Sequence, residues 1–138
     1  MIYITRKEHF NAAHKLSNPE WDDERNLAVF GKCSNKNWHG HNYNLHVTVK
    51  GEVNKETGFV VNMKDLGELI KGKVIDVLDH KNLNLDVAGL KNTMPSTENI
   101  AIFIWDTLLP EVRKMGAELH CVRLCETENN YVDYFGGK

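Results

Sequence analysis

Three histidines and one cysteine are the residues of this chain whose types and spacing could bind a metal. His39 and His41 form a His-x-His pair, Cys33 precedes the pair, and His14 closes an earlier run, His-Phe-Asn-Ala-Ala-His. Zinc in a catalytic site usually takes three protein ligands and keeps a fourth position open for water or substrate. Three imidazoles suit that role, and we predict a zinc site made by His14, His39 and His41.

Cys33 lies in a polar segment between two lysines, Lys32 and Lys36. A cysteine in a folded protein is by default a small buried hydrophobe. Nearby cations and a metal instead favour the thiolate form. We therefore predict that Cys33 is a base that removes a proton and is not a zinc ligand. The alternative is a structural site in which Cys33 is the fourth ligand.

Two expected strands bring the histidines together. Residues 2–14 and 40–53 alternate apolar and polar side chains, which is typical of strands with one buried face. If the two strands pair antiparallel, the end of the first lies beside the start of the second. His14 then faces His39 and His41, which share one side of their strand because they are two residues apart.

The connection between these strands is much longer than a hairpin turn needs. It runs for 24 residues, from Lys15 to Trp38. Structureless connections of this length inside a domain are usually functional or disordered. We expect this segment to leave the metal site and return to it, which carries Cys33 back beside the metal.

The rest of the chain predicts two helices and a closing pair of strands. One amphipathic helix begins at a cap, Asn62 or Asp65, and a second, largely buried helix is capped by Ser96. Strands are expected at residues 118–126 and 131–135. This order predicts an α+β fold in which a four-stranded antiparallel sheet carries two helices on one face.

The composition is that of an ordinary globular domain, which we expect to span residues 1–138. With 41% hydrophobic residues and a net charge of −2, the chain shows no basic stripe for a nucleic acid and no apolar stretch long enough for a membrane. Its first residues lack the pattern of a signal peptide, so a cytoplasmic location is expected. Three cysteines, an odd number, argue against a disulfide framework.

Two further groups of titratable residues stay ambiguous on this evidence. Asp79 and His80 end the first expected helix, where a protonated histidine gains from the helix dipole, so they suit either proton transfer or a simple C-cap. Glu126 closes a strand beside a turn and is, by itself, typical of a solvent-exposed strand end.

Longer stretches of the sequence match a known family. They are FNAAH, VFGKCSNKNWHGHNYNLHVTVKGEV, TGFVVNMKDL, LDHKNLNLDV, STENIAIFIWDTL and ETENNYV. On these stretches the chain resembles the 6-pyruvoyl-tetrahydropterin synthases of the tunnelling-fold group over essentially its full length. The resemblance implies a lyase that converts 7,8-dihydroneopterin triphosphate to 6-pyruvoyl-tetrahydropterin with loss of triphosphate, in tetrahydrobiopterin biosynthesis.

The same resemblance implies roles for individual residues. Zn²⁺ would be the cofactor on the three histidines, Cys33 the base, and Asp79 and His80 its partners in a proton relay. Glu126 corresponds to the carboxylate that anchors the pterin ring. Three more residues correspond to a Thr-Thr-Glu stretch near the pterin, with serine in place of the first threonine: Ser96, Thr97 and Glu98.

The resemblance also implies a homohexamer, a dimer of trimers, with active sites between subunits. Asp79, His80 and, in one arrangement, Glu126 would then reach the zinc of a neighbouring chain.

Two alternatives stay open. The first is 6-carboxy-tetrahydropterin synthase of queuosine biosynthesis, which acts on the same substrate and typically has three residues between the cysteine and the His-x-His pair. Here five residues, from Ser34 to Trp38, separate them, and this spacing favours the pyruvoyl enzymes. The second alternative is a zinc- or pterin-binding protein without catalysis.

Overall fold

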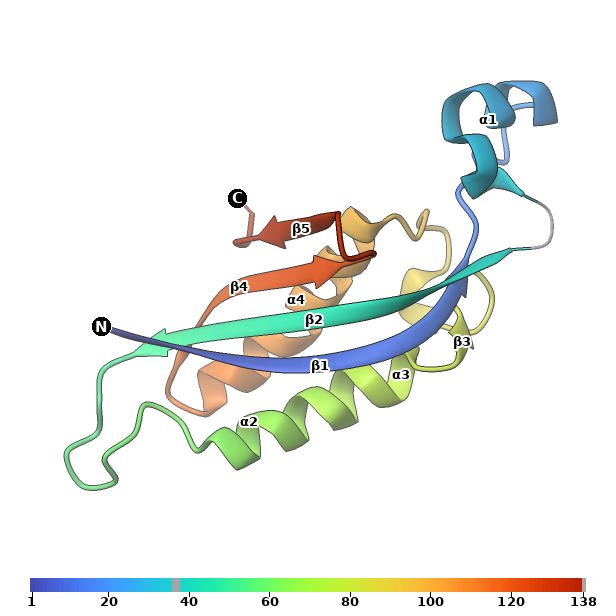
Figure 1. The fold of residues 1–138 in the computed structure, drawn as a ribbon. Helices are drawn as coiled ribbons and strands as arrows, with labels where there is room; N and C mark the ends of the chain where they lie inside the picture. Colours follow the sequence, from blue (N-terminus) through green and yellow to red (C-terminus); the bar gives the residue numbers. More distant parts are fainter. Residues whose placement is uncertain (36–37, 138) are drawn as a thin grey trace.

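A long antiparallel hairpin, β1 (Ile2–His14) and β2 (His39–Gly51), forms the centre of the sheet in the computed structural model (Figure 1). The two strands pair along their whole length, up to His14 opposite His39. The buried side chains alternate along each strand, as the pattern predicts, at Phe10, Ala12 and His14 of β1 and at Tyr43, Leu45, Val47 and Val49 of β2. The prediction of two paired strands is therefore confirmed, with the predicted bounds for β1 and with bounds for β2 that differ by one residue at its start and two at its end.

The structure describes residues 1–35 and 38–137. Lys36, one of the two lysines expected to flank Cys33, lies outside the described residues.

The sheet has five strands in the order β3-β1-β2-β4-β5. β4 (Glu118–Cys125) pairs antiparallel with β2, and β5 (Tyr131–Tyr134) pairs antiparallel with β4. β3 (Lys81–Asn82) pairs parallel with β1 at its C-terminal end. The predicted sheet of four antiparallel strands is thus wrong by one short parallel strand. A strand of two residues is too short to show an alternating pattern, so the sequence gives no sign of it.

Two helices cover one face of the sheet (Figure 1). The first runs as α2 (Met63–Ile70), a π-helical turn (Lys71–Ile75) and α3 (Asp76–Leu78), and the second is α4 (Thr97–Lys114). Ser96 caps α4, as predicted, because its hydroxyl accepts a hydrogen bond from the backbone of Asn99. Among the described residues, no helix combines the length and apolar character needed to span a membrane.

The prediction of only two helices missed α1 (Asp23–Phe30), which lies in the long connection, beyond the end of the hairpin (Figure 1). Only Asn26 of this helix is buried, so its sequence carries no apolar stripe to predict it. Asp22 caps it with its side chain, which accepts a hydrogen bond from the backbone of Arg25 at 2.7 Å. Short 3-10 helices follow at Gly31–Ser34 and, later, Ala88–Leu90.

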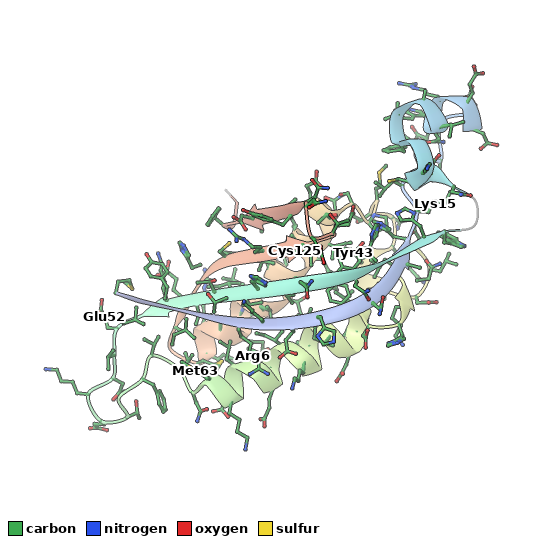
Figure 2. All side chains as sticks on the ribbon, in the orientation of Figure 1. Arg6, Lys15, Tyr43, Glu52, Met63 and Cys125 are labelled. Carbon is green, nitrogen blue, oxygen red and sulfur yellow. The ribbon has the colours of Figure 1, made fainter. Side chains whose placement is uncertain are left out.

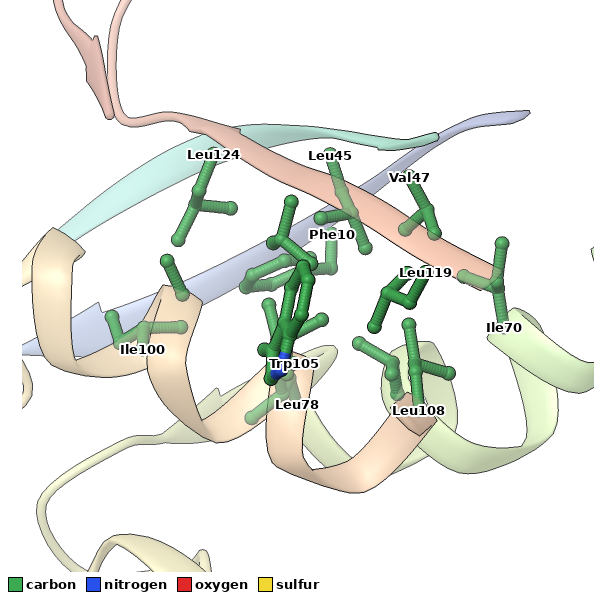
Figure 3. Packing of buried hydrophobic residues seen from close by; sticks show 14 of the residues in the cluster. Phe10, Leu45, Val47, Ile70, Leu78, Ile100, Trp105, Leu108, Leu119 and Leu124 are labelled. Carbon is green, nitrogen blue, oxygen red and sulfur yellow. The ribbon is translucent and has the colours of Figure 1, made fainter. Parts of the chain in front are cut away.

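One hydrophobic core lies between the sheet and these two helices (Figure 3). Phe10 and Leu45 of the hairpin pack with Leu78 of α3 and with Ile100 and Trp105 of α4. Phe10 and Ala12 of β1 and Tyr43 of β2 belong to this core and lie next to the hairpin end that carries the histidines, so the core positions that end. Figure 2 places Lys15 and Tyr43 toward this end and Glu52 at the opposite one.

The N-cap of α2 gives a test of local stability. Asn62 accepts hydrogen bonds from the backbone nitrogens of Lys64, at 2.9 Å, and Asp65, at 3.4 Å. Asn62→Ala removes these bonds, and we expect it to lower the free energy of unfolding by about 1 kcal/mol in urea denaturation. Asn62→Asp keeps an acceptor and serves as the control. An equal loss in both variants would contradict the capping role.

Candidate metal centre and active site

The hairpin end brings three imidazoles together. His14 lies opposite His39 across the hairpin, and His41 lies opposite Ala12. The ring centroids are 4.5 Å apart for His14 and His39, 4.8 Å for His39 and His41, and 5.0 Å for His14 and His41. One nitrogen of each ring lies within 4.8 Å of the others, so the three side chains could hold one metal ion.

The hydrogen bonding of these rings fits a metal. Both ring nitrogens of His39 and Nε2 of His41 are buried and have no hydrogen-bond partner among the described residues. Buried polar atoms ordinarily have partners, and a metal ion would supply one. Nδ1 of His14 lies 2.8 Å from the carbonyl oxygen of Pro95. Because a carbonyl only accepts, Nδ1 carries the proton and Nε2 is the nitrogen free to bind a metal.

The electrostatic environment keeps two of the rings neutral. Burial lowers the pKa of His14, against the opposing effect of the Pro95 carbonyl, and the neighbouring His39 and His41 lower it further. Burial and then His41 also lower the pKa of His39. The neutral imidazole is the form that coordinates a metal, so the site favours the binding state of these side chains.

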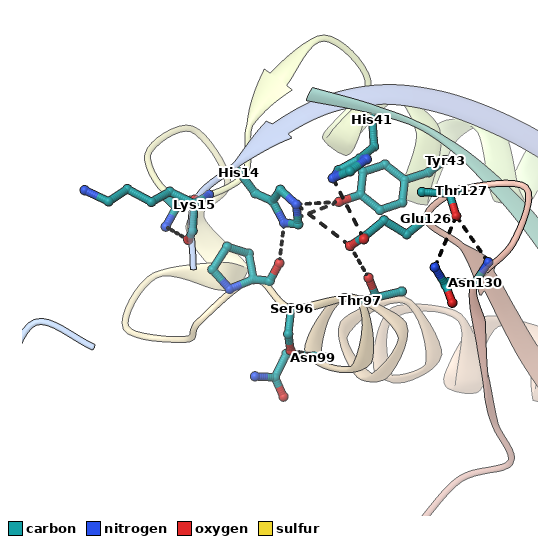
Figure 4. A network of polar contacts seen from close by, with 12 residues as sticks. His14, Lys15, His41, Tyr43, Ser96, Thr97, Asn99, Glu126, Thr127 and Asn130 are labelled. Carbon is teal, nitrogen blue, oxygen red and sulfur yellow. Dashed lines mark hydrogen bonds and ion pairs between the residues drawn. The ribbon is translucent and has the colours of Figure 1, made fainter. Parts of the chain in front are cut away.

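Glu126, directly after β4, faces the histidines of its own chain (Figure 4). Its Oε1 lies 3.9 Å from Nε2 of His41, and its Oε2 lies 3.9 Å from Nε2 of His14. Thr97, the first residue of α4, donates a hydrogen bond to Oε2 at 2.6 Å. This bond fixes one carboxylate oxygen. Glu126 therefore lies beside the histidine cluster of its own chain, and no neighbouring chain is needed to bring it there.

A cavity of about 270 Å³ adjoins this carboxylate. It is lined by all four residues that the sequence predicts to bind substrate: Ser96, Thr97, Glu98 and Glu126. The N-terminus of α4 and the end of β4 form its polar side, and Leu16 and Val132 contribute apolar surface. A flat, polar ring is the kind of group that such a mixed lining suits.

Tyr43 is a candidate site residue that the sequence analysis did not identify. Its side chain is fully buried, and its hydroxyl oxygen lies 3.3 Å from Nδ1 and 3.4 Å from Nε2 of His14. Burial, and then the charges of Glu126 and Cys33, raise the pKa of Tyr43 well above its ordinary value, so the hydroxyl stays neutral. Its position two residues after His41, on the same strand face, is the sequence signal that could have found it.

Cys33 lies in the 3-10 helix at the return of the long connection. Its carbonyl oxygen accepts a hydrogen bond from the backbone nitrogen of Leu16 at 2.7 Å, which ties it to the segment that follows His14. The cysteine is free and half-buried. The connection thus returns Cys33 toward the histidines, as the sequence suggested, and its role as a base stays a prediction.

Asp79 and His80 lie at the outer edge of β1. The backbone N–H of Asn11 donates to Oδ1 of Asp79 at 2.8 Å, and the backbone N–H of His80 donates to the carbonyl of Asn11 at 2.6 Å. Oδ2 of Asp79 lies 3.0 Å from Nδ1 of His80, whose side chain is 80% exposed. Asn11 and His14 point to opposite strand faces, and no contact among the described residues joins this pair to the histidine cluster.

The pKa of Asp79 predicts how this corner responds to acid. The Asn11 N–H, and then His80, hold it below the ordinary value of 3.8. The stabilisation by the carboxylate is therefore present above that value and is lost as the pH falls through the pKa of the folded state. We expect Asp79→Asn to lower the urea midpoint at pH 7, and we expect this difference from the wild type to shrink as the pH falls below 3.8. Asp76→Asn, one turn earlier, is the control. A difference between Asp79→Asn and wild type that persists undiminished at low pH would contradict this explanation.

The fold and the site together define a class of protein, an α+β domain with three imidazoles poised for a metal at one end of a single sheet and a carboxylate-lined cavity beside them. A family model described as 6-pyruvoyl tetrahydropterin synthase matches residues 3–137. The chain belongs to this family.

Individual relatives agree with the family assignment. The human and Dictyostelium discoideum proteins named 6-pyruvoyl tetrahydrobiopterin synthase are each 44% identical to this chain, over 133 and 135 residues. These matches cover 96% and 98% of this chain, and 90% and 96% of the respective relatives. The structure of Caenorhabditis elegans 6-pyruvoyl tetrahydropterin synthase superposes with a TM-score of 0.91 at 35% identity, and the match covers 99% of this chain and 96% of that one. The family predicted from the resemblance is thus confirmed.

Proposed function

We propose that this protein converts 7,8-dihydroneopterin triphosphate to 6-pyruvoyl-tetrahydropterin with elimination of triphosphate, as a carbon–oxygen lyase of tetrahydrobiopterin biosynthesis. One observation carries the proposal. The three imidazoles of His14, His39 and His41 lie next to a carboxylate, Glu126, that borders a cavity. Family membership and the names of the relatives support the same activity.

Zn²⁺ is the metal we propose for His14, His39 and His41, because zinc accepts three imidazole nitrogens and keeps a position open. When bound there, it would supply Lewis-acid polarisation of the substrate's side-chain oxygens and make the adjacent carbon-bound proton more acidic. The carbonyl of Pro95 would hold the His14 ring in the orientation that presents Nε2.

Glu126 would anchor the pterin ring. A carboxylate can accept paired, charge-assisted hydrogen bonds from the ring's amino group and the adjacent N–H. The hydroxyl of Thr97 already donates to Oε2 and holds the carboxylate in place at the cavity. Ser96 and Glu98 line the same cavity and would contact the ring from the start of α4. This binding would set which carbon of the side chain faces the metal centre.

Cys33 would remove the acidified proton, and Asp79 and His80 would relay protons. Asp79 holds Nδ1 of His80, which leaves Nε2 free to exchange a proton with another group. The His80 side chain is largely exposed, and it lies apart from the histidine cluster of its own chain. We therefore propose that it completes the site of a neighbouring subunit in a homohexamer of two trimers. The cytoplasmic location stays a prediction.

A product assay tests the proposed function directly. The zinc-loaded protein is incubated with 7,8-dihydroneopterin triphosphate, and the pterin product is identified by mass spectrometry. We expect 6-pyruvoyl-tetrahydropterin together with free triphosphate. A 6-carboxy product with acetaldehyde would instead assign the queuosine-type activity. Binding of the substrate without turnover would identify a pterin-binding protein and refute the enzyme.

A further inference from the structure

A second cavity, of about 510 Å³, lies under the long connection between β1 and β2. Two lysines that line this cavity are sequence neighbours of proposed site residues. Lys15 directly follows His14, and Lys32 directly precedes Cys33. Two ammonium groups are therefore placed on the two segments that carry a proposed metal ligand and the proposed base.

The wall of this cavity is held in shape by the protein itself. The amide of Asn26, which is buried in α1, accepts a hydrogen bond from the backbone of Asn18 at 2.7 Å. The same amide donates to the carbonyl of Asn18 and to that of Asp22, at 3.1 Å each. Trp21 stacks on Phe30, with ring centroids 5.9 Å apart. Residues 18–30 thus form a structured wall, and a ligand would not have to order it.

The two cavities lie on either side of the segment that follows β1. Leu16 lines the cavity that Glu126 borders, whereas its neighbours Lys15 and Ser17 line the second one. The hydrogen bond from the backbone nitrogen of Leu16 to the carbonyl oxygen of Cys33 connects this segment to the 3-10 helix that carries Cys33. His14 directly precedes this segment, so a molecule with a ring in one cavity and a charged group in the other would pass the histidine cluster.

We propose that Lys15 and Lys32 form the subsite for the triphosphate group of the substrate. This inference rests on the proposed function, because that substrate has a pterin ring and a triphosphate at opposite ends of a three-carbon chain. With the ring at Glu126 and the chain's hydroxyls at the metal centre, the phosphates extend toward the second cavity. Ammonium groups bind phosphate oxygens as point charges and stabilise the triphosphate as it leaves with its negative charge.

The charges around the cavity support an anion there. Neither Lys15 nor Lys32 forms an ion pair in the part of the chain that the structure describes. The hydroxyl-bearing residues Ser17 and Ser34 line the same space and add hydrogen-bond donors. One acidic residue, Asp23, also lines it and opposes an anion. Removal of this carboxylate therefore gives a variant with an effect of opposite sign.

Binding of inorganic tripolyphosphate tests the subsite without turnover. The zinc-loaded protein is titrated by calorimetry, and its zinc content is measured afterwards to exclude chelation by the probe. We expect Lys15→Gln and Lys32→Gln each to weaken binding roughly 10-fold, the loss of one charge-assisted contact. Asp23→Asn should tighten binding. Lys15→Gln keeps both contacts between its backbone and Asn84, so the fold is preserved.

Lys55→Gln, at the opposite end of the hairpin, is the matched control and should bind like the wild type. Unchanged binding in the double lysine variant, or no binding by the wild type, would overturn the subsite. The KM for the pterin triphosphate separates the two proposals. If the double variant makes the pyruvoyl product with an unchanged KM, the subsite is wrong and the proposed function stands. If the wild type binds tripolyphosphate at the lysines but makes no pterin product, the proposed function is wrong.

Discussion

His39→Ala is expected to abolish metal binding and turnover while the fold survives. The ring of His39 has no hydrogen-bond partner among the described residues, so its loss removes no structural contact of that kind. Among the described residues the ring contacts His14 and His41, the other two proposed ligands. We expect the zinc affinity to fall by more than the roughly 10- to 100-fold that the loss of an outer partner of a ligand costs. Competition with a chromogenic chelator measures this affinity, and circular dichroism checks the fold.

His14→Ala gives the informative contrast, because His14 is fully buried and bonded to the Pro95 carbonyl. We expect this variant to lose both zinc and stability. His9→Ala, on the opposite and exposed face of β1, is the matched control and should keep both. Wild-type zinc affinity in His39→Ala would remove the basis for the metal centre.

Cys33→Ala is expected to keep zinc and lose turnover. If Cys33 is the base, its removal should lower kcat by roughly 100- to 10,000-fold, the usual contribution of general acid–base catalysis. The side chain is half-buried and packs outside the hydrophobic core, so the variant should fold normally. Steady-state kinetics together with zinc analysis of the same sample measure both effects.

Cys125→Ala is the control for this experiment, since Cys125 is also free and half-buried but lies on β4, away from the long connection. It should retain wild-type kcat. Two outcomes of Cys33→Ala would refute the predicted role. Full turnover would show that another group is the base, and loss of zinc would show that the thiol is a metal ligand.

The sequence predicts the clustering of His14, His39 and His41 because this geometry depends on local rules. An alternating pattern identifies β1 and β2, and an antiparallel hairpin must bring the end of one beside the start of the other. That pairing alone places His14 opposite His39. The helix caps at Asn62 and Ser96 are equally local, since a cap involves only the next few residues.

The features that the sequence does not predict depend on contacts between distant segments. β3 exists because the chain after α3 returns to the edge of β1, where Asn11 bonds with Asp79 and His80. The hydrogen bond from Thr97 to Glu126, at the wall of the cavity, joins residues 29 positions apart. The roles of Asp79, His80 and Glu126 are implied only by the resemblance to a family, because spacing and composition do not show which distant residues become neighbours.

The carbonyl of Pro95 immediately precedes the residues that begin α4, so a single turn of chain serves two purposes. The Pro95 carbonyl accepts a hydrogen bond from the His14 imidazole. The next residue, Ser96, caps α4, and Thr97 at the start of this helix donates a hydrogen bond to Glu126. A movement of that turn would shift both the His14 ring and the Glu126 carboxylate. We therefore expect a substitution in this turn to change the positions of His14 and Glu126 together, and with them the proposed metal affinity and the proposed ring binding.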